Sequence, residues 1–302
     1  MYTIIAGGSG LIGRALTEDL TADGHEIIIL SRRPEQVRDL PPGARAIRWD
    51  GRTPEGWQEY VEECDAIVNL TGTRIAPWPW TAARKRQILD SRVHSGAAVT
   101  QAVAGAAKRP RVVVQASGVG FYGPRGDESI DETAAPGDDF LAQVCIAWEA
   151  TAEPLDALGV RRVIIRTGHV LSRTGGLLPY LALPYRLWLG GPMGNGRQGQ
   201  PWIHIADHVT AVRWLIEHEV ASGAFNLVAP QYTTNASMSR ALGQALGRPA
   251  IVTVPTFVLR LLLGEEATIL LDGQHPVPAR LQELGFSFRF PTAEAALSDL
   301  LG

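Results

Sequence analysis

The sequence predicts an α/β protein with a doubly wound parallel sheet and a smaller, mixed C-terminal domain. Over the first 170 residues, short β-branched runs alternate with helical patterns, as they do in stacked strand–helix units. Several of these runs are continuously apolar, which is typical of parallel strands covered on both faces. Beyond residue 170 the alternation ends and glycine and proline become denser, which indicates a second kind of architecture.

The expected strands of the first part are the β-branched runs at 2–6, 26–30, 44–49, 66–70, 111–116 and 162–166. A helix is expected over 11–23, ended by Gly24, and a long helix after Thr81, whose hydroxyl can cap it. The apolar and small residues that recur at helical spacing in the long helix predict its buried stripe. They are Leu89, Val93, Gly96, Ala97, Thr100 and Val103.

The second part begins with a segment, 173–199, whose many glycines and prolines favour loops over a long regular element. A strand at 202–205, a helix at 207–218 and a strand at 224–228 follow. The tail from 235 to 301 reads as mostly helical, with Gly247 and Gly264 as C-caps. We therefore expect a nucleotide-binding domain over 1–170, joined by 200–230, and a smaller substrate domain over 171–199 and 231–302.

Composition narrows the class of protein. The 302 residues include 28 basic and 31 acidic side chains, for a net charge of −3, which argues against a nucleic-acid partner. Only Lys85 and Lys108 are lysines, so arginine makes up the rest of the basic residues. Genomic bias is the simplest reason, but any chemistry that needs a lysine has two candidates.

Cysteine use and hydropathy give further expectations. Cys64 and Cys145 stand alone, without metal-ligand spacing, so neither a disulfide scaffold nor a metal site is predicted. The longest apolar stretch, 251–263, contains a proline and an arginine and is too short to span a bilayer. A strand pattern follows Met1 directly, with no leader pattern. We expect a cytoplasmic protein with no membrane partner.

A glycine-rich turn joins the first strand to the first helix. Its residues 7–13 read Gly-Gly-Ser-Gly-Leu-Ile-Gly. Glycines at these spacings allow a tight turn, close approach of the backbone to a pyrophosphate and close helix–strand packing. The helix N-terminus adds free N–H groups and a positive dipole end. This context is that of a Rossmann-type fold. The residues predicted to bind the dinucleotide are Gly7, Gly10, Leu11, Ile12 and Gly13.

The end of the second strand indicates which dinucleotide is bound. An NAD site places a carboxylate there for the ribose 2′-hydroxyl, whereas a 2′-phosphate requires arginine. This chain has Ser31, Arg32 and Arg33 and no acid. A guanidinium can bind a phosphate through two hydrogen bonds. NADP(H) is therefore predicted over NAD(H); the alternative is that both arginines form a solvated basic loop.

Two further strand ends complete the predicted cofactor site. Asp50 follows the third strand, where its side chain can reach the adenine edge. Leu70, Thr71 and Gly72 follow the fourth strand. Because the carboxyl ends of parallel strands share one edge of the sheet, these residues are expected to lie along the cofactor.

In these residues the chain resembles the extended short-chain dehydrogenase/reductase superfamily. More closely, it resembles the atypical "epimerase family" branch of nucleoside-diphosphate-sugar epimerase-like proteins, which has its own C-terminal domain. The matching stretches cover essentially the whole chain. They are 7–13, 69–72, 80–85, 91–93, 116–123, 166–168, 194–197, 202–207, 240–243, 261–264, 273–274 and 286–291.

The resemblance implies hydride transfer by a nicotinamide cofactor held against a sugar nucleotide. The superfamily uses a Tyr-x-x-x-Lys pair, in which the lysine favours the tyrosine phenolate. In this chain Thr81 stands four residues before Lys85, and Ala104 four before Lys108. No tyrosine therefore heads such a pair.

The helix that matches the superfamily's catalytic helix covers 141–149. By this match Leu141 stands where the tyrosine belongs and Cys145 where the lysine belongs. Gly118 takes the position of the hydroxyl residue that ends the fifth strand, with Ser117 directly before it. These departures put the usual oxidation chemistry in doubt, although they are typical of this branch.

Other residues are candidates for the missing chemistry. Ser117 and Tyr122 lie at the end of the fifth strand and are the candidate catalytic residues. The alternative for Tyr122 is that it packs the loop together with Phe121. Arg92 on the long helix can bring a positive charge to the site, although a solvent-facing arginine is the more frequent outcome.

Two residues of the second part are candidate substrate contacts by resemblance. Arg197, in a glycine-rich loop, suits a substrate phosphate or carboxylate; the alternative is an exposed loop arginine. His204 is a candidate pocket residue, and its alternative is a structural histidine. His208 lies four residues further on, but no third ligand follows, so zinc is not predicted.

These observations lead to two functional hypotheses. The first is an NADP-dependent oxidoreductase or epimerase with an atypical active site, acting on a small polar substrate such as a nucleotide sugar. The second is a catalytically silent NADP(H)-binding regulatory or interaction protein, which the missing Tyr-x-x-x-Lys pair favours. The resemblance also allows a homodimer through the long helices.

Overall fold

The computed structural model describes residues 1–75 and 80–302. In these ranges the centre is a seven-stranded sheet in the order β11-β7-β5-β4-β1-β2-β3, paired in parallel throughout. Its strands are β1 (Tyr2–Ala6), β2 (Glu26–Ser31), β3 (Ala44–Arg48), β4 (Ala66–Asn69), β5 (Val112–Gly118), β7 (Arg161–Thr167) and β11 (Gly223–Leu227). The predicted α/β fold class and the strands expected in the first part are confirmed.

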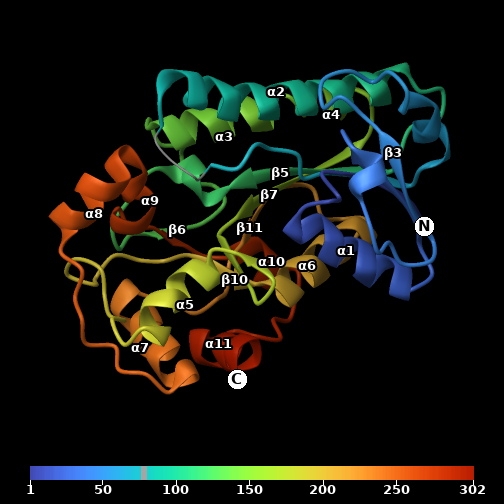
Figure 1. Cartoon of the computed structure of the whole chain (residues 1–302). Coiled ribbons are helices and arrows are strands. Elements are labelled where there is room, and N and C mark those ends of the chain that lie inside the picture. Colours follow the sequence, from blue (N-terminus) through green and yellow to red (C-terminus); the bar gives the residue numbers. More distant parts are fainter. Residues whose placement is uncertain (76–79) are drawn as a thin grey trace.

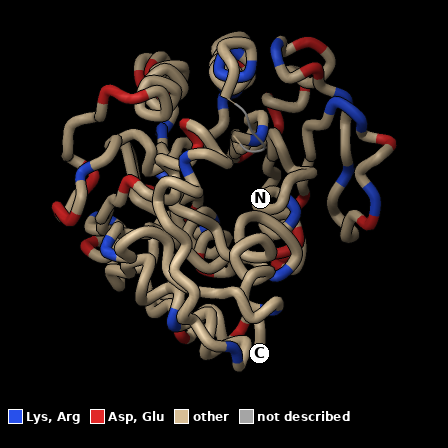
Figure 2. The backbone as a smooth tube through the Cα atoms, turned by 60° about the vertical axis from the view of Figure 1, so that its left-hand side comes forward, with Lys and Arg blue, Asp and Glu red and all other residues tan. Residues whose placement is uncertain are grey.

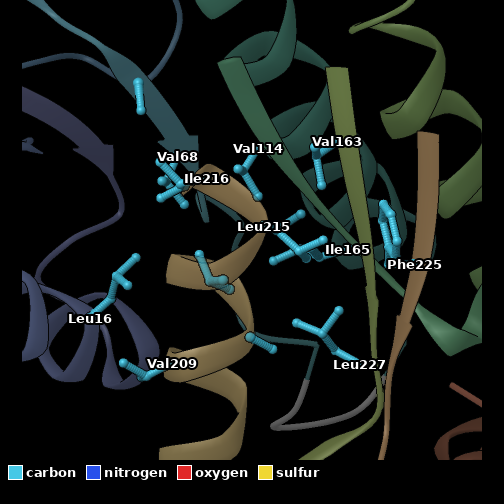
Figure 3. Packing of buried hydrophobic residues seen from close by; sticks show 14 of the residues in the cluster. Leu16, Val68, Val114, Val163, Ile165, Val209, Leu215, Ile216, Phe225 and Leu227 are labelled. Carbon is cyan, nitrogen blue, oxygen red and sulfur yellow. The ribbon is translucent and has the colours of Figure 1, made fainter. Parts of the chain in front are cut away.

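Helices cover both faces of the sheet (Figure 1). On one face lie α1 (Leu11–Ala22) and α6 (Ile205–Glu217); on the other lie α2 (Ala82–Gly105), with α3 (Phe140–Ala150) and α4 (Pro154–Ala157) packed against it. Figure 3 shows the core on the α1–α6 side, where Leu16, Val209 and Leu215 meet Val114 and Ile165 of the sheet. Burial on both faces explains why these strands are continuously apolar.

The long helix α2 is capped as predicted, since the Thr81 hydroxyl accepts a hydrogen bond from the Arg84 N–H. Its buried face, however, differs from the predicted stripe: Leu89 and Val93 are only half-buried and Ala97 is exposed. The buried residues are Ile88, Arg92, Ser95, Gly96, Ala98, Val99, Thr100, Ala102 and Val103. The chain just after α3 packs closely against this face, since a Cβ on Gly96 would meet Thr151 Oγ1 at 2.0 Å.

The remaining elements lie below the sheet in Figure 1 or beside its β11 edge. The strands form two small sheets, β10-β8-β9 and β12-β6. They are β6 (Ser129–Ile130), β8 (His169–Ser172), β9 (Gly175–Gly176), β10 (Trp202–His204) and β12 (His275–Pro276). The helices are α5 (Leu178–Arg186), α7 (Asn235–Leu246), α8 (Thr256–Leu263), α9 (Thr268–Leu271), α10 (Ala279–Glu283) and α11 (Ala293–Leu301).

The expectation of loops over 173–199 is wrong for α5, which buries Leu178, Ala182 and Tyr185 against α7. This burial stabilises a helix whose interior contains Pro184; Pro179 lies in the first turn, where proline is tolerated. The predicted C-caps are confirmed, because Gly247 and Gly264 end α7 and α8 at φ values of 61° and 57°. No helix in the described part of the chain is long and apolar enough to cross a membrane.

Candidate functional site

A cleft of about 870 Å³ opens where β1, β2, β3 and β4 end, and it continues along the first half of α2. It lies at the point where the strand order reverses, because the chain passes from β1 to β2 on one side and returns to β4 on the other. Parallel sheets bind ligands at such a switch point. The predicted residues that line it are Gly7, Gly10, Ser31, Arg32, Arg33, Asp50, Leu70, Thr71 and Gly72. Leu11, Ile12 and Gly13 lie directly behind, in the first turn of α1.

The glycine loop is shaped to hold a pyrophosphate. Gly7 has a φ of 81°, and a Cβ on it would lie 3.0 Å from the Leu70 carbonyl carbon. A Cβ on Gly13 would lie 2.5 Å from the Cα of Gly8, so only glycine allows this approach of helix and loop. Gly10 caps α1 without a side chain, which leaves the first N–H groups of the helix open. Such a terminus stabilises bound phosphate.

The charge of the cleft is predominantly positive. The guanidinium groups that line it belong to Arg14, Arg32, Arg33, Arg52 and Arg86, whereas its carboxylates come from Asp50 and Asp90. Basic and acidic residues are otherwise scattered over the molecule (Figure 2), whereas five arginines and two aspartates line this one cleft. In the described ranges Glu35 pairs with Arg48 rather than with either arginine that ends β2. The arginines are therefore available to a phosphate.

Asp50 lines the cleft, but its oxygen atoms close the loop that follows β3. The carboxylate accepts hydrogen bonds from the N–H groups of Arg52 (2.7 Å) and Thr53 (2.9 Å) and from the Thr53 hydroxyl (3.2 Å). Partial burial would raise the pKa of Asp50, but these hydrogen bonds lower it below its usual value. Asp50 thus shapes the cleft wall as a carboxylate, and its contact with adenine stays a prediction.

Ser117 lies at the end of β5, away from the arginines that follow β2. The register pairs Asn69 with Gln115, so Thr71 and Ser117, each two residues on, reach neighbouring positions at the same edge of the sheet. Ser117 is buried and is not among the residues that line the cleft. Its hydroxyl donates to Glu149 Oε1 at 2.6 Å. Glu149 in turn accepts hydrogen bonds from Arg166 Nε (3.0 Å) and Nη2 (2.9 Å), a two-pronged ion pair.

Tyr122 lies inside the protein. It is 0% exposed; its hydroxyl donates to Asn226 Oδ1 at 2.7 Å and accepts from Arg166 Nη1 at 3.0 Å. Burial raises the pKa of Tyr122, so its hydroxyl stays protonated. The carboxylate of Glu132 accepts from the Asn226 N–H at 2.9 Å. The hydroxyl of Tyr122 is therefore committed to this buried network, and its ring packs against Phe121, as in the packing alternative.

The helix α3 presents Leu141 and Cys145 to the end of β5. A Cβ on Gly120 would lie 3.2 Å from the Leu141 Cβ, and one on Gly118 would lie 3.8 Å from Cys145 Sγ. The thiol donates to the Gly118 carbonyl at 3.6 Å. Burial raises the pKa of Cys145 to about 11, so the thiol is neutral. An apolar side chain and a neutral thiol thus face the strand end.

Sequence reasoning favoured a solvent-facing Arg92, and this was wrong. The residue is only 8% exposed, and its guanidinium lies 5.0 Å from the ring centre of Trp148. Its Nη1 donates to the carbonyls of Thr73 (3.1 Å) and Ile88 (3.0 Å). The helical spacing of Ile88, Arg92 and Ser95 was the available signal, but hydrophobicity alone assigns arginine to the outside.

The two predicted substrate residues of the second part do not line the cleft. Arg197 is exposed on its loop, and only its backbone N–H is engaged, by Asn195 Oδ1 at 2.9 Å. His204 is 3% exposed and caps α6, because its Nδ1 accepts from the Ala206 N–H at 3.0 Å. Burial lowers the pKa of His204, whose ring stacks on Phe290. These contacts are those of a structural histidine.

Comparison with known proteins bears on this site. Residues 3–227 match the model of the "NAD dependent epimerase/dehydratase family", and residues 254–300 match a "domain of unknown function (DUF1731)". The chain belongs to the NAD dependent epimerase/dehydratase family. The second match covers α8, α9, α10 and most of α11, in agreement with the resemblance to a branch that has its own C-terminal domain.

Individual members of the epimerase/dehydratase family are similar over their full length. The bovine "Epimerase family protein SDR39U1" is 40% identical over 306 residues, with 100% of each chain covered. The crystal structure of the human protein SDR39U1 (isoform 2) with NADPH is 36% identical, with a TM-score of 0.88 and coverage of 100% of this chain and 99% of that one.

A more distant structure supports the fold alone. The UDP-glucuronic acid 4-epimerase from Bacillus cereus, in complex with UDP-glucuronic acid and NAD, has a TM-score of 0.80 at 13% identity. It covers 100% of this chain and 99% of that one. The similarity of fold therefore extends over the whole chain.

Proposed function

We propose that this chain is an NADP-dependent oxidoreductase or epimerase that acts on a small polar substrate and prefers NADP(H) to NAD(H). The observation that carries the proposal is the end of β2, where Arg32 and Arg33 line the cleft and no carboxylate replaces them. A carboxylate there would repel a 2′-phosphate, whereas a guanidinium binds it. The human relative, whose structure was determined with NADPH, supports the same choice.

In this proposal each part of the cleft has one task. The loop around Gly7, Gly10 and Gly13, with the N-terminus of α1, holds the pyrophosphate. Arg32 and Arg33 bind the 2′-phosphate, Ser31 closes the ribose side, and the Asp50 loop forms the adenine wall. The backbone at Leu70, Thr71 and Gly72 runs along the nicotinamide half. The nicotinamide, when bound, supplies a hydride acceptor or donor.

The reaction end would work without the Tyr-x-x-x-Lys pair. Ser117 is our candidate for orienting a substrate oxygen, since its hydroxyl is already held by Glu149 at 2.6 Å. Arg166 and Tyr122 would act as positioning residues that keep Glu149 in place. We propose that 1–170 and 200–230 bind the cofactor, whereas 171–199 and 231–302 close over the substrate, with Arg197 at its distal end.

The cofactor proposal is tested by thermal stabilisation. A ligand at a hundred times its Kd stabilises a protein by about 2.7 kcal/mol. We expect a larger rise in Tm with NADPH than with NADH, and loss of the difference in an Arg32→Gln/Arg33→Gln double variant. Arg38→Gln, an exposed arginine outside the cleft, is the matched control and should behave like wild type. Equal responses of the wild type to both cofactors would refute the 2′-phosphate argument.

The second candidate is a silent NADP(H)-binding regulatory protein, which Leu141 and Cys145 favour because neither can act as a base at the end of β5. Product analysis on a library of nucleotide sugars and polar carbonyl compounds separates the two, since an epimerase recycles its cofactor without an absorbance change. Turnover that falls in Ser117→Ala supports the enzyme. Cofactor binding without any product across the library supports the regulatory protein.

A further inference from the structure

We infer that Arg92 binds a negatively charged group of the substrate, a carboxylate in the first instance, at the floor of the cleft near its reaction end. The inference rests on the proposed function and adds a substrate class to it. It starts from the position of Arg92 between the end of β4 and helix α3, with Thr73 on one side and Trp148 on the other.

The charge of Arg92 is buried without a compensating carboxylate. The residue is only 8% exposed. Within the described ranges its hydrogen bonds go to two neutral carbonyls, those of Thr73 and Ile88. The four residues 76–79 contribute no acidic side chain. Burial lowers the pKa of Arg92, against an opposing effect of Cys145, and the nearby charge of Arg84 lowers it slightly further. A buried cation with no counter-ion is costly, and a bound anion would remove that cost.

The polar atoms of Arg92 are divided in a way that suits a ligand. Its Nη1 is occupied by the two carbonyls, whereas Nε and Nη2 have no partner among the described residues. These two N–H groups form one edge of the guanidinium, and such an edge matches the two oxygen atoms of a carboxylate. Nη1 thus fixes the side chain, and the edge formed by Nε and Nη2 remains for a ligand.

Glycine at position 72 keeps the approach to this guanidinium open. A Cβ on Gly72 would lie 2.9 Å from Arg92 Cζ, 3.1 Å from Nη2 and 3.3 Å from Nε. Gly72 itself is exposed and lines the cleft, as do its neighbours Thr73 and Ser91. Arg92 therefore lies directly under the cleft floor. A side chain at position 72 would clash with the guanidinium, so only glycine allows the guanidinium to lie this close below the lining residues.

The cofactor phosphates do not account for this charge. The cleft already holds the α1 N-terminus for a pyrophosphate and exposed arginines at the end of β2 for a 2′-phosphate. Arg92 lies beyond both, on the side where Thr71 and Ser117 meet at the ends of neighbouring strands. A guanidinium that only bridged two carbonyls would need no charge, because the amide of a glutamine donates to carbonyls as well.

The test measures thermal unfolding of the NADPH-saturated protein in sodium acetate and in sodium chloride at equal ionic strength. Wild type should melt about 2–4 °C higher in acetate, the shift expected for a weak ligand in moderate excess. Arg92→Gln, which keeps a donor to the carbonyls and removes the charge, should abolish the difference. Arg92→Lys should retain part of it, and Arg38→Met, on the exposed surface, should retain all of it. Inorganic phosphate in place of acetate distinguishes a phosphate group from a carboxylate.

Each outcome decides the inference. Equal melting of wild type in acetate, phosphate and chloride would overturn it, whether or not the variants fold. An acetate response of the same size in Arg92→Gln would also overturn it, because the response would then come from another cation or from the general exclusion of the salt from the protein surface. NADPH stabilisation is recorded first on the same samples. Its absence in wild type removes the proposed function, whereas NADPH stabilisation without an acetate response removes only the role of Arg92.

Discussion

The two ends of the candidate site differ in the exposure and the pairing of their charged side chains. At the ends of β2 and β3 the arginines are exposed and line an open cleft. Among the described residues, only Asp50 and Asp90 contribute carboxylates to its lining. At the ends of β5, β7 and β11 the charges are buried and paired, with the Arg166 and Glu149 side chains only 7% and 13% exposed. Exposed arginines can rearrange around a phosphate, whereas a buried pair holds one geometry. The first end is suited to binding and the second to positioning.

The two ends also differ in the residue types that they present. The glycine loop and the arginines follow the general pattern for a phosphorylated dinucleotide. The reaction end instead places Leu141 and Cys145 against β5 and builds a network from Ser117, Glu149 and Arg166. Arg92 lies between the two, buried like the network but without a carboxylate partner among the described residues. The following experiments test this division, from the largest expected effect to the smallest.

Removing one charge from the buried pair should have the largest effect. Glu149→Gln leaves the Arg166 guanidinium buried and unpaired, which costs about 3–5 kcal/mol. The free energy of unfolding from urea denaturation measures the loss. Asp156→Asn is the matched control, because it breaks the more exposed pair with Arg162, whose side chains are 22% and 55% exposed. That change should cost less than about 1 kcal/mol. Equal losses in the two variants would contradict the contrast between exposed and buried charge.

The glycine loop should tolerate no side chain where helix and loop touch. Gly13→Ala places a Cβ against the backbone of Gly7 and Gly8, and we expect a loss of about 1–3 kcal/mol together with loss of NADPH stabilisation. Gly105→Ala at the end of α2 meets nothing within 4 Å and should gain about 0.4–1 kcal/mol. Thermal unfolding with and without NADPH measures both. Normal NADPH stabilisation of Gly13→Ala would show that cofactor binding does not need the close packing of helix and loop at this glycine.

A buried histidine should make the protein less stable in mild acid. Burial lowers the pKa of His208 to about 3 from the usual 6.5, and its Nε2 lies 3.1 Å from Thr167 Oγ1. The unfolded chain therefore takes up the proton first, so stability is complete above pH 6.5 and is lost as the pH falls. Between about pH 6.5 and about pH 5.5 the loss should be about 1 kcal/mol. In urea denaturation, His208→Gln should lose about 1 kcal/mol of this pH dependence, whereas exposed His94→Gln should keep all of it. The slope that remains in His208→Gln comes from His169 and His204, whose pKa values burial also lowers. A slope unchanged in His208→Gln would refute this assignment.

The sequence by itself determined the parallel sheet, the glycine loop, the N-cap at Thr81 and the C-caps at Gly247 and Gly264. These features depend on local properties: the period of apolar residues, the conformations open to glycine and the hydrogen bonds of a helix end. The positions of Arg32 and Arg33 were predictable in the same way. Both residues directly follow a strand that the apolar pattern locates, so no knowledge of packing was needed.

Only the tertiary structure decided which polar side chains are buried and what they contact. Tyr122 and Asn226 are 104 positions apart, and Ser117 and Glu149 are 32 apart, so no local pattern could pair them. The buried face of α2 is the one against which α3 and α4 pack, and Arg92 lies on that face beside Trp148 of α3. Burial is a property of the segments that meet in the fold, and for Arg92 it turns an arginine expected on the surface into a buried charge, with no carboxylate partner in the described ranges.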